Sequence, residues 1–160
     1  MSKYLIKGAS LYGEKIADIL IEDGVISRIA ENIDAADAQV VEAAGQVALP
    51  GLVDIHTHLR QPGYEASETV ETGTRAAALG GYTAVFAMAN SLPVADTAAV
   101  VEQVDRLGKE AGWCRVQPIG AVTVGLKGER LSDIGGMATS TANVRVFSDD
   151  GMCVYDPAVM

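Results

Sequence analysis

The fold is decided by the stretch Gly51-Leu52-Val53-Asp54-Ile55-His56-Thr57-His58-Leu59-Arg60. Its two histidines are the only ones among the 160 residues, and they end a short apolar run. Because successive side chains of a strand point to opposite faces, His56 and His58 share a face, as does Arg60 if the extended geometry persists. The stretch therefore predicts a strand that delivers two imidazoles and a guanidinium to one spot.

Two interpretations of this histidine pair are open. The pair can be an exposed turn, or it can bind a metal ion, because histidine is a common ligand of catalytic metals and same-face spacing lets both rings reach one ion. The apolar run before the pair and the arginine two residues after it favour the metal site. We therefore expect His56 and His58 to be metal ligands.

Composition limits the class of function. The net charge of −9 argues against a nucleic-acid partner, which selects basic surfaces. No apolar run approaches the roughly 20 residues that span a bilayer, and the first residues do not have the pattern of a signal peptide. Cys114 and Cys153 lie far apart without a C-x-x-C spacing, which is typical of reduced structural thiols. We expect a cytoplasmic globular protein with no membrane contact.

Residues 1–49 predict a small β unit. They contain short runs with strand character, and Asp23-Gly24 is a strong hairpin signal between two of them. The expected strands are residues 4–7, where Gly8 ends the strand, and residues 16–22, 25–29, 39–42 and 46–49. We expect a β-sandwich-like unit that carries no chemistry of its own.

From residue 50 the pattern changes to alternating strands and helices. The expected strands are residues 51–55, 82–88, 115–124 and 143–147. The expected helices are residues 68–79, a second helix capped by Asp96-Thr97 and closed by Gly112, a weak one near 131–137, and another opening at 156–159. This α/β alternation predicts a parallel sheet, and four such strands are half of a (β/α)8 barrel. Residues 50–160 are thus interpreted as the first part of a catalytic barrel, in a chain that is a piece of a longer product.

In such barrels the chemistry lies at the carboxyl ends of the strands. There the sequence places His56, His58 and Arg60 after the first strand, Asn90 after the second, and Asp149 and Asp150 after the fourth. Taken singly, Asn90 is an ordinary loop residue and the aspartates form an ordinary turn. Together, two histidines and a carboxylate suit a hydrolytic metal ion, while an arginine and an asparagine suit a substrate carboxylate.

The sequence resembles the amino-terminal part of a dihydroorotase of the amidohydrolase superfamily over residues 4–160. The resemblance rests on four motifs: Pro50 to Gly63, Glu71-Thr72-Gly73-Thr74, Met88-Ala89-Asn90, and Phe147-Ser148-Asp149-Asp150-Gly151. It implies a (β/α)8 enzyme that interconverts N-carbamoyl-L-aspartate and L-dihydroorotate in pyrimidine biosynthesis. It also implies Zn2+ as cofactor, with two ions in a complete site.

The resemblance also implies roles for single residues. His56 and His58 match the family's metal-binding pair, and His58, Arg60 and Asn90 match residues at the substrate. Asp150 matches the carboxylate that bridges two zinc ions in one branch of the family, with the neighbouring aspartate, Asp149, as the alternative.

The bridging group distinguishes this branch from its relatives. Hydantoinases, allantoinases and other dihydroorotases bridge their metals with a carboxylated lysine at the end of the fourth strand. Here the lysines are residues 3, 7, 15, 109 and 127, so none lies there. Arg145 is the nearest cation, and arginine does not deprotonate to form a carbamate. The aspartate-bridged branch therefore fits best.

Two departures from the family pattern remain. Ala89 stands where the family usually has proline, which would loosen the turn that aims Asn90. The family's further histidine ligands and its general-base aspartate are expected beyond Met160. Two alternatives also stay open: a non-catalytic dihydroorotase-like subunit that scaffolds aspartate carbamoyltransferase, and another cyclic amide hydrolase of the hydantoinase or allantoinase type. A homo-oligomer is expected as well.

Overall fold

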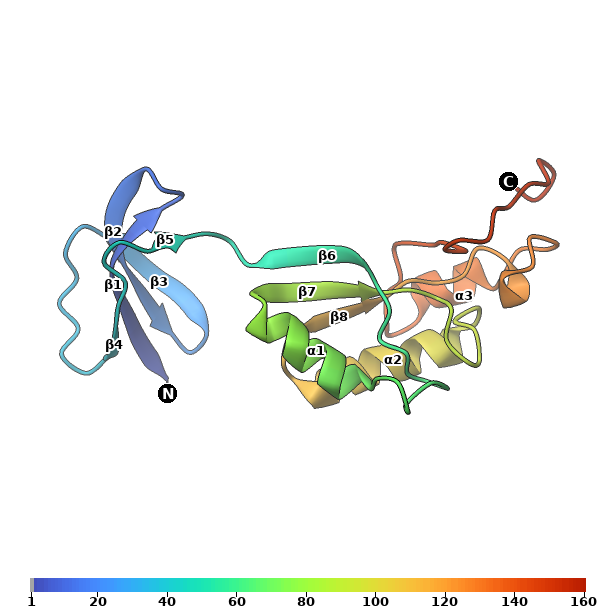
Figure 1. Ribbon diagram of the computed structural model, residues 1–160, viewed down its shortest axis with the longest axis horizontal. Helices are drawn as coiled ribbons and strands as arrows, with labels where there is room; N and C mark the ends of the chain where they lie inside the picture. Colours follow the sequence, from blue (N-terminus) through green and yellow to red (C-terminus); the bar gives the residue numbers. More distant parts are fainter. Residues whose placement is uncertain (1) are drawn as a thin grey trace. The chain divides into compact units, whose positions relative to one another are not determined.

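A computed structural model describes residues 2–160 and divides them into two compact units, with the boundary after Pro50. Each unit has its own sheet (Figure 1). No helix within residues 2–160 has both the length and the apolar character that crossing a membrane requires.

The first unit is one five-stranded sheet. Its strands are β1 (Lys3–Leu11), β2 (Lys15–Glu22), β3 (Val25–Ala30), β4 (Gln39–Glu42) and β5 (Val47–Ala48). The order is β3-β2-β1-β4, with β5 also paired to β1. β4 and β5 both pair with β1 in parallel, so all five strands belong to one sheet. A sandwich needs a second sheet, and residues 2–50 therefore do not form the expected sandwich.

A buried carboxylate stabilises an irregularity in this sheet. The register of β1 on β2 shifts between Ile6 and Ala9, and Gly8 between them has a φ of 72°. The Asp18 carboxylate accepts hydrogen bonds from the N–H groups of Ile33 (3.0 Å) and Gly8 (2.9 Å), and these bonds lower the pKa of Asp18. β1 therefore continues past Gly8, where the sequence predicts its end.

The second unit alternates strands and helices, so the fold class is α/β, as predicted. Its first elements are β6 (Leu52–Thr57), α1 (Val70–Leu79), β7 (Tyr82–Ala87), α2 (Ala98–Ala111) and β8 (Arg115–Pro118). The strands form a parallel sheet in the order β6-β7-β8, and α1 and α2 lie along one side of it (Figure 1). Helices and strands share a core made by Leu59, Val70, Val85, Val104 and Val116.

Local signals set the ends of both helices. Thr69 caps α1, because its hydroxyl accepts a hydrogen bond from the N–H of Thr72 and the Thr72 hydroxyl accepts one from the N–H of Thr69. α2 follows Thr97 and ends at Gly112, which adopts the left-handed conformation with a φ of 69°.

The third expected strand is shorter than the sequence predicts. β8 ends at Pro118 instead of Val124. Beyond it the chain leaves the sheet, because Ala121 donates its N–H to the carbonyl of Ala95 (2.8 Å) instead of to a neighbouring strand.

The fourth expected strand, 143–147, is wrong as a regular element. It is reduced to a single parallel bridge between Gly120 and Phe147. Two hydrogen bonds hold this bridge, from the N–H of Gly120 to Val146 (3.1 Å) and from the N–H of Ser148 to Gly120 (2.9 Å). The bridge nevertheless brings residues 148–150 beside the end of β8.

The remaining elements are short. A 3-10 turn, η1 (Val124–Leu126), precedes α3 (Ile134–Thr139), whose N-terminus is capped by the carboxylate of Asp133. The weak helix expected near 131–137 therefore starts at Ile134. Residues 157–159 form a turn, and the N–H of Met160 donates to the carbonyl of Asp156 (3.2 Å), which is the spacing of an α-helical hydrogen bond, so the expected helix opening stays a prediction.

Candidate metal centre

The two histidines lie at the carboxyl end of β6. His56 belongs to the strand and His58 follows its last residue, Thr57. Thr57 fastens this end to the neighbouring β7 segment, because its hydroxyl donates to the carbonyl of Phe86 (2.8 Å) and its carbonyl accepts from the N–H of Met88 (2.8 Å). The backbone that carries both imidazoles is therefore held on each side of Thr57.

An extra residue in β6 helps to aim the histidines. Asp54 pairs with Val85 and Thr57 pairs with Ala87. The chain therefore advances three residues in β6 while it advances two in β7. Such an irregularity changes the face to which the following side chains point. The centres of the two imidazole rings lie 5.3 Å apart, with the rings inclined at 67°.

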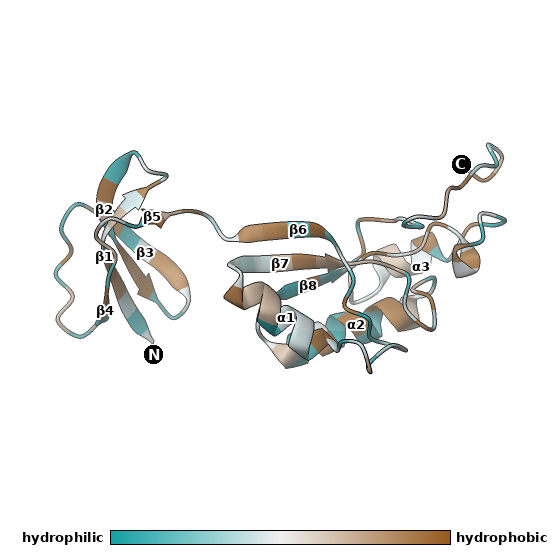
Figure 2. Ribbon diagram, in the orientation of Figure 1, coloured by the Kyte–Doolittle hydropathy of each residue, from teal (hydrophilic) through white to brown (hydrophobic). Residues whose placement is uncertain are grey.

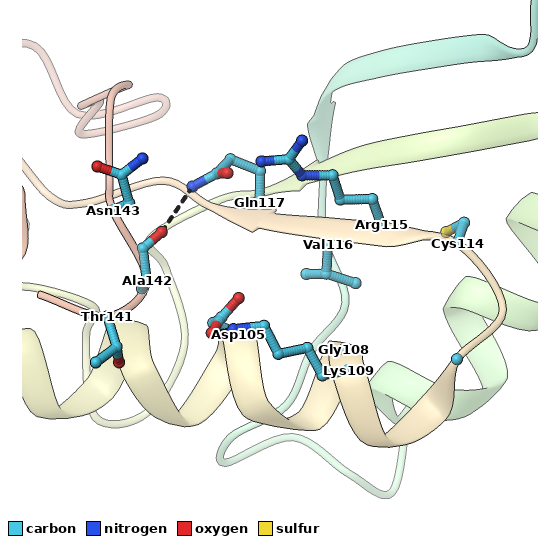
Figure 3. A pocket seen from close by; sticks show the side chains of 11 residues that line it. Asp105, Gly108, Lys109, Cys114, Arg115, Val116, Gln117, Thr141, Ala142 and Asn143 are labelled. Carbon is cyan, nitrogen blue, oxygen red and sulfur yellow. Dashed lines mark hydrogen bonds and ion pairs between the residues drawn. The ribbon is translucent and has the colours of Figure 1, made fainter. Parts of the chain in front are cut away.

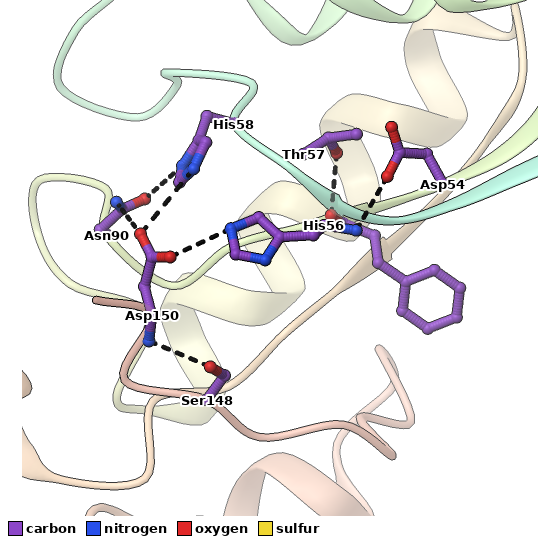
Figure 4. A network of polar contacts seen from close by, with 8 residues as sticks. Asp54, His56, Thr57, His58, Asn90, Ser148 and Asp150 are labelled. Carbon is purple, nitrogen blue, oxygen red and sulfur yellow. Dashed lines mark hydrogen bonds and ion pairs between the residues drawn. The ribbon is translucent and has the colours of Figure 1, made fainter. Parts of the chain in front are cut away.

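Asp150 meets both histidines (Figure 4). His56 Nε2 lies 3.0 Å from Asp150 Oδ1, and His58 Nε2 lies 3.8 Å from Asp150 Oδ2. The possible ligand atoms of the three residues all lie within 4.8 Å of one another. Ligands at zinc distances and tetrahedral angles are about 3.3 Å apart, so these separations fit a shared ion after small side-chain adjustments.

The side-chain amide of Asn90 lies beside this cluster. Its Oδ1 is 2.9 Å from His58 Nδ1, and its Nδ2 donates a hydrogen bond to Asp150 Oδ2 (2.7 Å) (Figure 4). Asn90 thus contacts two of the three possible ligands, a position for which the sequence predicted only a contact with the substrate.

The structure separates the two adjacent aspartates. Asp149 is buried, and its carboxylate accepts hydrogen bonds from the N–H groups of Val122 (2.8 Å) and Thr123 (3.0 Å) and from the Thr123 hydroxyl. Asp150 adopts a φ of 54° and turns its carboxylate towards the histidines. Asp150 is therefore the aspartate that geometry favours as a metal ligand, and Asp149 anchors the loop.

Arg60 does not join the histidines in the way that strand alternation predicts. β6 ends at Thr57, and Arg60 has a φ of 59°, so the extended geometry does not reach it. Its side chain is exposed. Arg60 and Asn90 line the same small hollow. Arg60 therefore lies near Asn90 but is not part of the histidine–aspartate cluster.

Sequence reasoning missed the residues that support the cluster. The Ser148 hydroxyl accepts a hydrogen bond from the N–H of Asp150 (3.0 Å), and the Thr123 hydroxyl accepts one from the N–H of Gly128 (2.9 Å) while it bonds Asp149. A serine two residues before an aspartate is a weak turn signal in sequence. Thr123 and Asp149 are 26 residues apart in the sequence, so no local sequence pattern predicts their contact.

A larger hollow lies elsewhere. It measures about 400 Å³ and lies between α2, β8 and residues 141–143 (Figure 3). Lys109 beside it is paired with Asp105 (2.6 Å), and Gln117 donates to the carbonyl of Ala142 (3.2 Å). Cys114 also lines it, and partial burial raises the pKa of this thiol. The hollow contains no residue of the histidine–aspartate cluster.

Comparisons with known proteins identify the family. The family model described as "Dihydro-orotase-like" matches residues 45–160. The chain is 63% identical to a dihydroorotase of Streptomyces coelicolor over its whole length and 62% identical to one of Leifsonia xyli over 98% of it, but it spans only 37% and 36% of those two proteins. An L-hydantoinase structure from Arthrobacter aurescens is similar with a TM-score of 0.61 and 25% identity, covering 79% of this chain and 29% of that one. The chain belongs to the dihydroorotase-like family.

Proposed function

We propose that the protein is a zinc-dependent dihydroorotase that interconverts N-carbamoyl-L-aspartate and L-dihydroorotate. The observation that carries this proposal is the convergence of His56, His58 and Asp150 within 4.8 Å, in a chain whose relatives at 62–63% identity are named dihydroorotase. A histidine pair and a carboxylate are the donor types that hydrolytic zinc sites use.

In this proposal His56, His58 and Asp150 hold the metal. When bound, the ion would lower the pKa of a water molecule to near 7 and polarise the amide carbonyl. Asp150 faces both histidines, which supports its place as a ligand of the ion that they share, and its role as the bridge to a second ion rests on the family resemblance. The buried Asp149 turns towards Thr123 instead, which supports Asp150 over its neighbour.

Arg60, Asn90 and His58 are proposed to bind the substrate. Both dihydroorotate and carbamoyl aspartate carry a carboxylate, which a guanidinium can hold through two parallel hydrogen bonds. Arg60 and Asn90 line the same hollow of about 10 Å³, which is too small for a carboxylate, but it shows that the two residues lie close enough to bind one carboxylate from the exposed side of Arg60. Arg60 would then set substrate affinity without touching the ion.

The finer fold is also a proposal. We infer that β6, β7 and β8 begin a (β/α)8 barrel and that residues 1–49 form a separate small β unit. The parallel order of the strands, the Gly120–Phe147 bridge at the next strand position and the similarity to the hydantoinase structure support this. The further metal ligands and the general base would come from residues outside this chain, which spans 37% of its Streptomyces coelicolor relative.

Because the general base is expected outside residues 1–160, this chain alone should be inactive, and the decisive experiment is an assay of the purified full-length protein in both directions before and after removal of metal. We expect interconversion of carbamoyl aspartate and dihydroorotate, loss of activity on dialysis against a chelator, and recovery on addition of Zn2+. Activity that survives complete metal removal would contradict the proposal.

The two alternatives give different results in the same assay. Bound zinc without turnover of either substrate would indicate a non-catalytic subunit, and co-purification with aspartate carbamoyltransferase would then test a scaffolding role. Faster hydrolysis of hydantoin or dihydrouracil than of dihydroorotate would indicate a hydantoinase-type enzyme, the alternative that the structural similarity favours.

A further inference from the structure

The backbone immediately before Asn90 is fixed by two hydrogen bonds. Met88 donates its N–H to Thr57 (2.8 Å), and the carbonyl of the fully buried Ala89 accepts the N–H of Ala95 (3.0 Å). The alanine that replaces the family's proline therefore does not leave this segment loose. The amide of Asn90 is held where it meets His58 and Asp150.

The two hydrogen bonds of Asn90 fix the orientation of its amide. An ionised carboxylate only accepts hydrogen bonds, so the amide must turn its NH2 group towards Asp150 Oδ2, as the 2.7 Å bond shows. This leaves the amide oxygen facing His58 Nδ1 at 2.9 Å. Because an amide oxygen only accepts, the proton of the neutral imidazole belongs on Nδ1.

The opposite ring nitrogen agrees with this assignment. His58 Nε2 lies 3.8 Å from Asp150 Oδ2, which is beyond hydrogen-bond distance. His56 Nε2, in contrast, is 3.0 Å from Asp150 Oδ1 and does make a close contact. With its proton on Nδ1, His58 directs the free electron pair of Nε2 towards the space between the three residues.

We propose that Asn90 is a positioning residue of the metal centre, which holds His58 in the Nδ1–H tautomer and fixes the Asp150 carboxylate so that both residues present their ligand atoms together. This inference rests on the proposed metal site and adds a role that differs from a contact with the substrate. Loss of a substrate contact raises KM alone, whereas loss of ligand positioning lowers metal affinity without any substrate present.

The first test measures Zn2+ affinity of the metal-free full-length protein by competition with a chromophoric chelator. We expect Asn90→Leu, which removes both hydrogen bonds at similar volume, to weaken zinc binding about 10- to 100-fold, the usual cost of losing a residue that orients a metal ligand. Asn32→Leu changes an exposed asparagine of the first unit and is expected to bind zinc as the unchanged protein does. Asn90→Ala is the second variant in case the leucine prevents folding.

The second test reads the tautomer directly. In the metal-free protein the ring 15N shifts of His58 should show the proton on Nδ1, and in both Asn90 variants this preference should be lost. A merely structural role for Asn90 would not change this signature in a variant that keeps its fold. Arg60→Met should raise KM for dihydroorotate and leave zinc affinity unchanged, which separates substrate binding from ligand positioning.

The outcomes distinguish this inference from the proposed function. If the Asn90 variants keep the zinc affinity and the His58 tautomer of the original protein, the positioning role of Asn90 is wrong but the metal site stands. If the original protein binds no zinc, both the positioning role and the proposed metal site are wrong. A variant that binds zinc weakly and has lost the Nδ1–H signature supports the role of Asn90.

Discussion

The adjacent residues Asp149 and Asp150 have opposite environments, and this difference predicts opposite effects of the same substitution. Asp150→Asn should remove a metal ligand and leave the fold intact, because its carboxylate faces the histidines from a partly exposed position. Asp149→Asn should destabilise the protein by about 1–3 kcal/mol, because an amide cannot accept all three hydrogen bonds that the buried carboxylate receives. Urea unfolding and zinc titration of both variants provide the measurement. Loss of zinc binding in a stable Asp149→Asn protein, with normal binding in Asp150→Asn, would reverse the assignment.

Asp18 predicts a pH dependence at the residue scale. Hydrogen bonds from Ile33 and Gly8 lower its pKa in the folded protein below the unfolded value of about 3.9. Its contribution to stability is therefore present above that value and is lost as the pH falls through the folded pKa. Asp18→Asn should lower the free energy of unfolding at pH 7, and its deficit should shrink when both proteins are unfolded by urea near pH 3. The exposed Asp34→Asn is the control, and a deficit that persists unchanged at pH 3 would contradict the prediction.

At the scale of elements, sequence predicted best where a few neighbouring residues determine the outcome. Gly112 ends α2 as expected, because a left-handed residue that closes a helix favours glycine locally. The lengths of the strands depended on distant partners. Alternation alone placed Arg60 beside the histidines, but the extra residue of β6 and the turn after Thr57 depend on pairing with β7. The histidine–aspartate cluster was predictable because both of its motifs end expected strands, whereas the bonds of Asn90 to it were not.

The packing of α2 against β8 gives a test at the element scale. A Cβ atom at Gly108 would lie 2.5 Å from Val116 Cβ, so Gly108→Ala should push the helix from the sheet and cost about 1–3 kcal/mol. Gly135 is a matched control inside α3, because a Cβ atom there would meet no atom within 4 Å. Gly135→Ala should be neutral or stabilise by about 0.5–1 kcal/mol. Equal effects of the two substitutions on thermal unfolding would show that α2 does not pack this closely.

At the scale of the whole molecule, the second unit exposes an apolar sheet edge. β6 is the first strand of its sheet, and Figure 2 shows its apolar character. Val53 and Ile55 on it are 54% and 72% exposed. An exposed apolar edge strand pairs readily with other chains, so residues 1–160 produced alone should associate or precipitate.

Sedimentation over a range of concentrations measures this association and locates it. Ile55→Lys places a charge on the edge strand and should shift the protein towards the monomer, because a charged edge disfavours pairing with another strand. Leu79→Lys is the matched control, since Leu79 is also exposed but lies at the end of α1. Equal effects of the two lysines would attribute association to general apolar exposure instead of to β6. If residues 1–160 without substitutions are a monodisperse monomer, the prediction is wrong, because the exposed edge of β6 then stays soluble in water without a neighbouring strand.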